Sequence, residues 1–100
     1  MQTEEQRRLL GAFVRARREA LQPDEAGKRR RTPGLRREEL AARAGIGSTW
    51  CAWIEQGRDV RPSAETLSRL ARALCLGRAE RAYLFELAVR HDPENPFTLA

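Results

Sequence analysis

Apolar residues recur along the chain at steps of three and four, which is the spacing of one face of an α-helix. The pattern fits five helical stretches, at about residues 4–21, 36–44, 47–56, 64–76 and 78–90. No segment alternates apolar and polar residues over the length of a strand. The sequence therefore predicts an all-α fold of five helices.

Glycine, proline and serine mark the boundaries of these helices. Pro23 follows the first helix, and Gly45, Gly57 and Gly77 follow the next three. Ser63 can cap the fourth helix, because its hydroxyl accepts a backbone N–H that is unpaired at a helix start. The inward positions that this reading predicts are Leu10, Phe13, Val14, Arg17, Leu21, Leu40, Ala41, Ala44, Cys51, Ile54, Leu67, Leu70, Ala71, Leu74, Leu84, Leu87 and Ala88.

The chain is basic, with Lys+Arg 19, Asp+Glu 14 and a formal net charge of +5 over 100 residues. One domain of this size and charge favours a polyanionic partner, with nucleic acid first and an anionic membrane surface second. The densest charge run lies in the linker between the first two helices and consists of Lys28, Arg29, Arg30 and Arg31. We expect this basic linker to contact DNA phosphates or a narrow minor groove; the alternative is a solvated charge run.

The chain lacks the residues that several classes of protein need. No apolar stretch is long enough to span a bilayer, and no apolar run follows the charged N-terminus, so we expect no membrane span and no signal peptide. Cys51 and Cys75 form neither a disulfide framework nor a CxxC pair and are expected in the core, and a single His91 leaves zinc without ligands. The sequence predicts a cytoplasmic, nucleoid-associated protein with no metal, no cofactor, no small-molecule ligand in this domain and no enzymatic activity.

Residues 39–57 read as a short helix, a tight turn and a second short helix. Ala41 lies where the two helices cross, Gly45 turns the chain, and Ile46, Cys51 and Ile54 pack beneath. These are the mechanical requirements of a helix-turn-helix unit, whose second helix can enter the major groove of DNA.

This segment and its flanks resemble a known family. Glu39-Leu-Ala, Trp53-Ile-Glu-Gln-Gly-Arg and Arg61-Pro-Ser resemble the phage-repressor-like helix-turn-helix domains of the XRE/HipB type. More narrowly, Arg30-Arg-Thr-Pro-Gly-Leu-Arg-Arg-Glu and Glu80-Arg-Ala-Tyr-Leu-Phe-Glu-Leu-Ala resemble the MmyB-like transcriptional regulators of high-GC bacteria. The resemblance implies a five-helix DNA-binding domain at residues 1–90, with residues 91–100 as the stub of a linker to a C-terminal domain.

The resemblance also implies roles for individual residues. Base contacts are expected from Ser48, Thr49 and Trp53, although Ser48 could instead only cap the helix. Arg18 and Glu55 match a largely buried ion pair between the first and third helices. Gly47 and Arg36 stand where the family has a Ser or Thr cap. The contacts to the DNA backbone are expected from Arg36, Arg37, Gly47, Trp50, Arg58 and Arg61.

The expected partners are double-stranded DNA and a second copy of the chain. A homodimer would place one recognition helix in each half-site, and the resemblance puts its surface at residues 61–65 and 77–81. One or both of Tyr83 and Phe85 are expected to pack against the second subunit or a further domain. Two other classes stay open: a basic surface for an acidic protein partner, and an RNA-binding or antitoxin-like module.

Overall fold

The computed structural model describes residues 1–21 and 34–94, and in these ranges the secondary structure is entirely helical. The fold is all-α, as the periodicity predicted, and each helix boundary lies within three residues of the expected one. The five helices are α1 (Glu4–Ala20), α2 (Arg37–Ala44), α3 (Ser48–Glu55), α4 (Ala64–Ala73) and α5 (Arg78–Ala88). Among the described residues, none of these helices is both long and apolar enough to cross a membrane.

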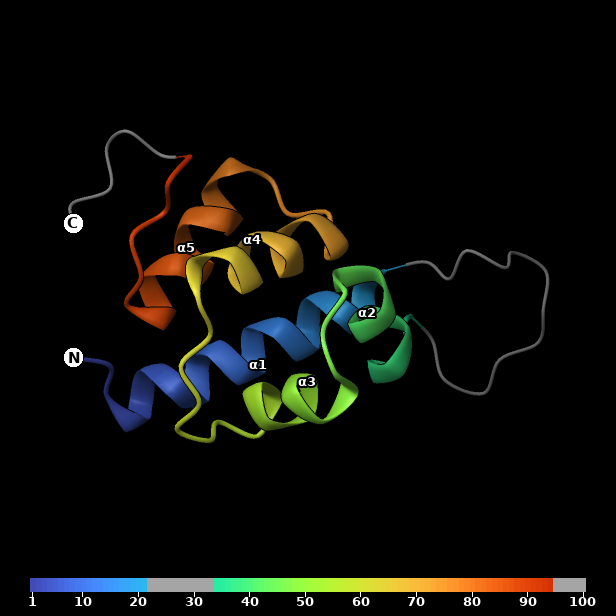
Figure 1. The fold of residues 1–100 in the computed structure, drawn as a ribbon, viewed down its shortest axis with the longest axis horizontal. Helices are drawn as coiled ribbons and strands as arrows, with labels where there is room; N and C mark the ends of the chain where they lie inside the picture. The colour runs from blue at the N-terminus through green and yellow to red at the C-terminus, as the bar shows by residue number, and fades with distance from the viewer. Residues whose placement is uncertain (22–33, 95–100) are drawn as a thin grey trace, which may run out of the picture.

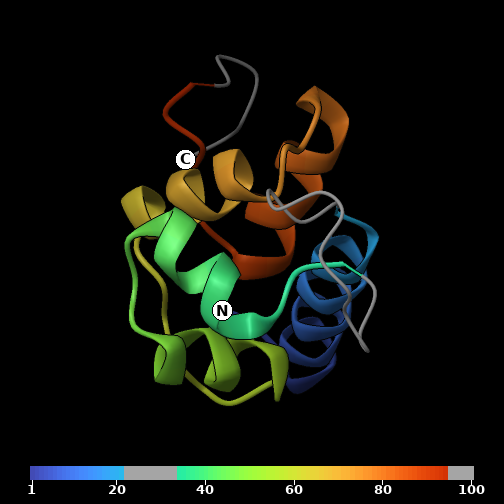
Figure 2. The same ribbon diagram turned by 90° about the vertical axis from the view of Figure 1, so that its right-hand side faces the viewer.

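Helix α1 lies between α3 and α5. It packs against α3 on one side and α5 on the other, while α2 packs against α3 and α4 (Figures 1 and 2). The predicted stripes of α2 to α5 meet in one core, so those inward positions are confirmed. The largest fully buried side chains of this cluster are Phe85, Leu40, Ile54, Leu67, Leu70, Leu74, Leu84 and Val14.

The inner face of α1 differs in one residue from the predicted stripe. Arg17, which the spacing placed inward, is partly exposed and forms an ion pair with Glu80 of α5 at 2.9 Å. Arg18 is the buried arginine. Gly11 allows α1 to lie directly against the end of α3, because a Cβ at this position would be 2.5 Å from the carbonyl oxygen of Glu55. A larger residue at Gly11 would push the two helices apart.

The end of α4 corrects two expectations. The helix ends at Ala73, and Cys75 takes a left-handed conformation with a φ of 57°. Its side chain is exposed, so the expectation that Cys75 lies in the core is wrong. Gly77 does not terminate α4 but is the N-cap of α5, where its N–H donates to Glu80 Oε1 at 3.0 Å.

The two aromatic residues of α5 have different surroundings. Phe85 is 1% exposed and belongs to the core of this chain, so it is not a surface for a partner. Tyr83 is 40% exposed and packs edge-on against Phe13 of α1, with the ring centroids 5.2 Å apart. This aromatic contact ties α5 to α1.

Residues that follow α5 are held by an ion pair that sequence reasoning missed. The Asp92 side chain is 2% exposed, and its two oxygens accept from Arg81 Nε at 2.9 Å and Arg81 Nη2 at 3.0 Å. Arg81 also donates to Ser68 Oγ of α4 at 2.8 Å and forms an ion pair with Glu94 at 2.6 Å. Burial by itself raises the pKa of Asp92, but the hydrogen bonds from Arg81 and the Glu94 N–H outweigh it and leave that pKa lowered. Asp92 and Glu94, two residues of the expected linker stub at residues 91–100, thus contact Arg81 of α5.

Candidate nucleic-acid interface

The turn between α2 and α3 is built by local backbone chemistry. Gly45 caps α2 in the left-handed conformation, with φ 69° and ψ 35°. The Ile46 N–H then donates to the Ala41 carbonyl at 3.0 Å, which satisfies a carbonyl left open at the end of the helix. Ile46 packs against the core from this turn. The turn places α3 across α2, as a helix-turn-helix unit requires.

Helix α3 has a buried face and an exposed face. Cys51 is fully buried and Ile54 is 2% exposed, whereas Ser48 and Thr49 in the first turn are exposed. Burial, with the nearby Glu55 carboxylate, raises the pKa of the Cys51 thiol to about 11, so the thiol is neutral in the core. Gly47 is the N-cap, and a Cβ built on it meets nothing within 4 Å. The start of α3 is therefore open to a partner.

Trp50 and Trp53 lie three positions apart on α3 and share a face of the helix. Trp50 is 40% exposed and Trp53 is half-buried, with ring centroids 6.4 Å apart. The Arg58 guanidinium lies 5.6 Å from the centre of the Trp53 ring and donates to Gln56 Oε1 at 2.9 Å. The cation thus covers Trp53, and Trp50 is the more exposed of the two indoles.

Beneath this surface, the structure brings Arg18 and Glu55 together. Arg18 Nε and Nη2 donate to the two Glu55 oxygens at 2.8 and 2.9 Å, and the side chains are 8% and 2% exposed. These hydrogen bonds raise the pKa of Arg18 above its ordinary value despite the cost of burial. We call Arg18 and Glu55 the α3 ion pair. The pair holds the C-terminal end of α3 against α1.

The same arginine holds the chain that enters α2. Arg18 Nη1 donates to the Leu35 carbonyl at 2.8 Å, and the Leu35 N–H donates to the Arg18 carbonyl at 3.1 Å. Leu35 is fully buried, although it lies in the segment between the first two predicted helices, 4–21 and 36–44. Gly34 makes this approach possible: its φ is 76°, and a Cβ would be 2.1 Å from the Glu19 carbonyl oxygen.

A signal for the burial of Leu35 was present in the sequence. An apolar residue immediately before a helix cap pairs with one at the fourth helical position, here Leu40, in a hydrophobic staple. The third helical residue, Glu39, accepts the Arg36 N–H at 2.8 Å, as in a capping box. Arg36 itself supplies no side-chain cap, as expected, so the helix start is satisfied from Glu39.

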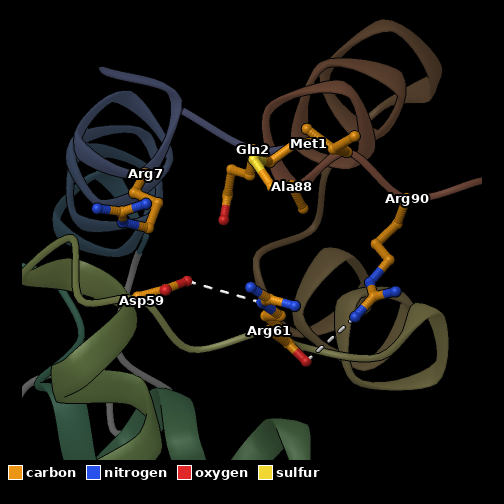
Figure 3. A pocket seen from close by; sticks show the side chains of 8 residues that line it. Met1, Gln2, Arg7, Asp59, Arg61, Ala88 and Arg90 are labelled. Atoms are coloured by element: carbon orange, nitrogen blue, oxygen red, sulfur yellow. Dashed lines mark hydrogen bonds and ion pairs between the residues drawn. The ribbon is translucent and has the colours of Figure 1, made fainter. Parts of the chain in front are cut away.

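The expected DNA-backbone residues divide into two groups. Arg37 lies beside α3, with its Nε 3.5 Å from Glu55 Oε1 and 40% of its side chain exposed. Arg61 instead lines a separate hollow of about 500 Å³ together with Arg7 and Arg90 (Figure 3). There it faces Asp59 at 3.8 Å, and its carbonyl accepts from Arg90 Nη2 at 3.4 Å. Arg37 and Arg58 are close to α3, whereas Arg61 is tied to the end of α5.

Three further expectations concern the basic linker, the dimer segment and metal binding. The basic linker (Lys28, Arg29, Arg30 and Arg31) falls outside the described residues. In the expected dimer segment at residues 77–81, Glu80 and Arg81 are engaged within the chain by Arg17 and Asp92. Within residues 1–21 and 34–94, no group of His, Cys, Asp or Glu has the arrangement needed to hold a metal ion.

Comparison with known proteins supports the interpretation of this surface. A family model described as a helix-turn-helix domain matches residues 9–84, which include all of α2, the turn and α3. Neither the curated proteins nor the solved structures give a match. The matched range covers most of the chain, and the chain belongs to the helix-turn-helix domain family.

Proposed function

We propose that the chain is the DNA-binding domain of a bacterial transcriptional regulator of the XRE type, similar to the MmyB-like regulators. The observation that carries this proposal is the exposed first turn of α3, which offers Ser48, Thr49 and Trp50 to a partner. Helix-turn-helix proteins place this turn against base edges in the major groove. The α3 ion pair supports the role, because it holds the helix from its buried side.

In this proposal, Ser48, Thr49 and Trp53 contact base edges, and Gly47 and Trp50 lie against the DNA backbone. Arg36 and Arg37 at the start of α2, and Arg58 and Arg61 after α3, contact phosphates. The Arg37 side chain supports this assignment, because 40% of it is exposed beside the C-terminal end of α3.

Two further parts of the proposal extend beyond α3. The basic linker of Lys28, Arg29, Arg30 and Arg31 neutralises phosphates next to the start of α2, where its chain enters the bundle at Gly34. A homodimer binds a near-palindromic operator with one α3 in each half-site. Residues 61–65 supply part of the dimer surface.

The test is the salt dependence of DNA affinity, measured by fluorescence anisotropy with random duplexes and duplexes selected from genomic fragments. We expect a steep loss of affinity with salt and one selected duplex bound well above random. Replacing Arg29, Arg30 and Arg31 with alanine should make the slope shallower, by about one unit for each phosphate that the linker no longer neutralises.

The matched control replaces three exposed arginines on α1 and α4, Arg8, Arg15 and Arg72, with alanine. It removes the same charge but should change the slope less. Absence of DNA affinity at low salt would overturn the proposal and assign the basic surface to a protein partner. Stronger binding to single-stranded RNA than to duplex DNA would overturn it in favour of an RNA-binding module.

A further inference from the structure

The exposed face of α3 has an unusual chemistry for a surface that reads DNA. The only charged residue of the helix is Glu55, and its side chain is 2% exposed and turned toward Arg18. The outward positions of the helix carry two hydroxyls, the methyl groups of Thr49 and Ala52, and the indoles of Trp50 and Trp53. The surface is polar only at its start and apolar along the rest.

The side chains that usually discriminate bases by paired hydrogen bonds are absent from α3. Guanine is read by Arg or Lys and adenine by Asn or Gln, each through two hydrogen bonds. Helix α3 contains none of these four residue types. Gln56 follows the helix, but its Oε1 already accepts from Arg58 Nε. Arg58 in turn lies over Trp53. The amide and guanidinium groups that follow α3 are thus engaged with each other and with an indole.

One base-pair feature in the major groove is matched by an apolar surface. Thymine alone among the four bases carries a methyl group there, and small apolar side chains contact it. From this match we infer, building on the proposed DNA-binding function, that α3 selects its sites by covering thymine methyl groups. Thr49, Ala52 and Trp53 form the covering surface, and Trp50, which also lies against the DNA backbone, extends it. The Ser48 and Thr49 hydroxyls supply the polar contacts.

The geometry of the helix supports this division of roles. Residues at positions i, i+3 and i+4 of a helix share a face, so Thr49, Ala52 and Trp53 line one edge of α3 and Trp50 lies beside them. Arg58 fixes the Trp53 ring, so the indole surface is ordered before DNA arrives. A preorganised apolar surface loses less side-chain entropy on binding than long flexible arginines would.

The test uses duplexes in which thymine is replaced by uracil one position at a time. This change removes only the methyl group and leaves the hydrogen-bonding edge of the base pair intact. The preferred site is first selected from random duplexes, and affinity is then measured by anisotropy. We expect a loss of about fourfold for each methyl group that the helix covers, because burial of one methyl-sized group is worth that much. Uracil outside the central site should have no effect.

A double-mutant cycle assigns the contact to the helix. Thr49→Ser removes one methyl and keeps the hydroxyl, and Trp50→Ala removes the exposed indole. Uracil at the contacted position should cost less in one of these variants than in the parent chain. Leu9→Ala is the control, because Leu9 on α1 is 40% exposed, the same fraction as Trp50.

The results distinguish failure of thymine selection by α3 from failure of the proposed DNA-binding function. A specifically bound site that tolerates uracil at every position would overturn the inference and leave the DNA-binding function intact. A selected site without thymine in its central half-sites would do the same. Absence of any specific site would overturn the proposed function itself.

Discussion

Two buried arginine–carboxylate pairs stabilise this small bundle, and they lie in different parts of it. The α3 ion pair of Arg18 and Glu55 joins the first and third helices and also binds the Leu35 carbonyl. The second pair, Arg81 and Asp92, which we call the C-terminal ion pair, joins α5 to the residues that follow it and to Ser68 of α4. Both carboxylate side chains are 2% exposed.

The difference between the pairs concerns what each one positions. The α3 ion pair lies directly behind the helix proposed to read DNA. Arg37 joins the pair, with its Nε 3.5 Å from Glu55 Oε1. The C-terminal ion pair contacts α4, α5 and residues 92–94, and none of its described contacts involves α3. We therefore expect the first pair to affect stability and DNA binding together, and the second to affect stability alone.

The largest effect is expected from breaking the α3 ion pair. Arg18→Met keeps the apolar stem but leaves the Glu55 carboxylate buried without its main partner, which typically costs about 3–5 kcal/mol of the unfolding free energy. Urea unfolding followed by circular dichroism measures this loss. Where the variant is still folded, its DNA affinity should also fall, because α3 loses its support. A loss below about 1 kcal/mol would contradict the role assigned to this pair.

A smaller effect, with a pH signature, is expected from the C-terminal ion pair. Asp92→Asn keeps the shape and removes the charge, at a cost of about 1.5–3 kcal/mol near neutral pH. The pKa of Asp92 is lowered in the folded state, so its stabilisation is complete above the unfolded value of about 4 and is lost as the pH falls through the folded value.

Urea unfolding from neutral pH down to about pH 2 follows this linkage, and the gap between the parent chain and Asp92→Asn should close in the acid range. A gap that is constant with pH would show that the Asp92 charge contributes nothing. DNA affinity at neutral pH should be unchanged in the variant, in contrast to Arg18→Met.

The smallest effect is expected at the start of α3. Gly47→Ser adds a side chain in open space at a φ of −70°, where any residue is allowed. A serine N-cap and the reduced freedom of the unfolded chain should together stabilise the fold by a few tenths to about 1 kcal/mol. Thermal unfolding measures the gain, and a loss of stability would show that the helix start is more crowded than the structure indicates.

The fold could be predicted wherever apolar residues recur with the period of a helix. The spacing of Leu40 and Ala41 predicts the buried face of α2, and that of Cys51 and Ile54 predicts the buried face of α3. Leu35 had a signal in the hydrophobic staple, but the flanking proline and glycine made the segment read as linker. Arg18 and Glu55 were expected only from the family resemblance, because 37 residues separate them and no period connects them.

The remaining features depend on contacts that no local pattern encodes. Asp92 follows a helix and precedes two prolines, and only the folded position of Arg81 gives it a partner. Cys75 lies in line with an apolar stripe, yet the chain takes a left-handed turn there that points the thiol outward. Trp53 is less exposed than Trp50, and the Arg58 guanidinium that lies over its ring comes from beyond the end of the helix.

The most direct test compares two apolar side chains of equal exposure, Trp50 on α3 and Leu9 on α1, each 40% exposed. Alanine at each position is measured for affinity to a selected duplex, at a temperature where both variants are folded. We predict a loss of about tenfold or more for Trp50→Ala, as for a buried aromatic contact, and no change for Leu9→Ala. Equal affinities in the two variants, or a loss confined to Leu9→Ala, would contradict the assignment of α3 as the DNA-reading helix.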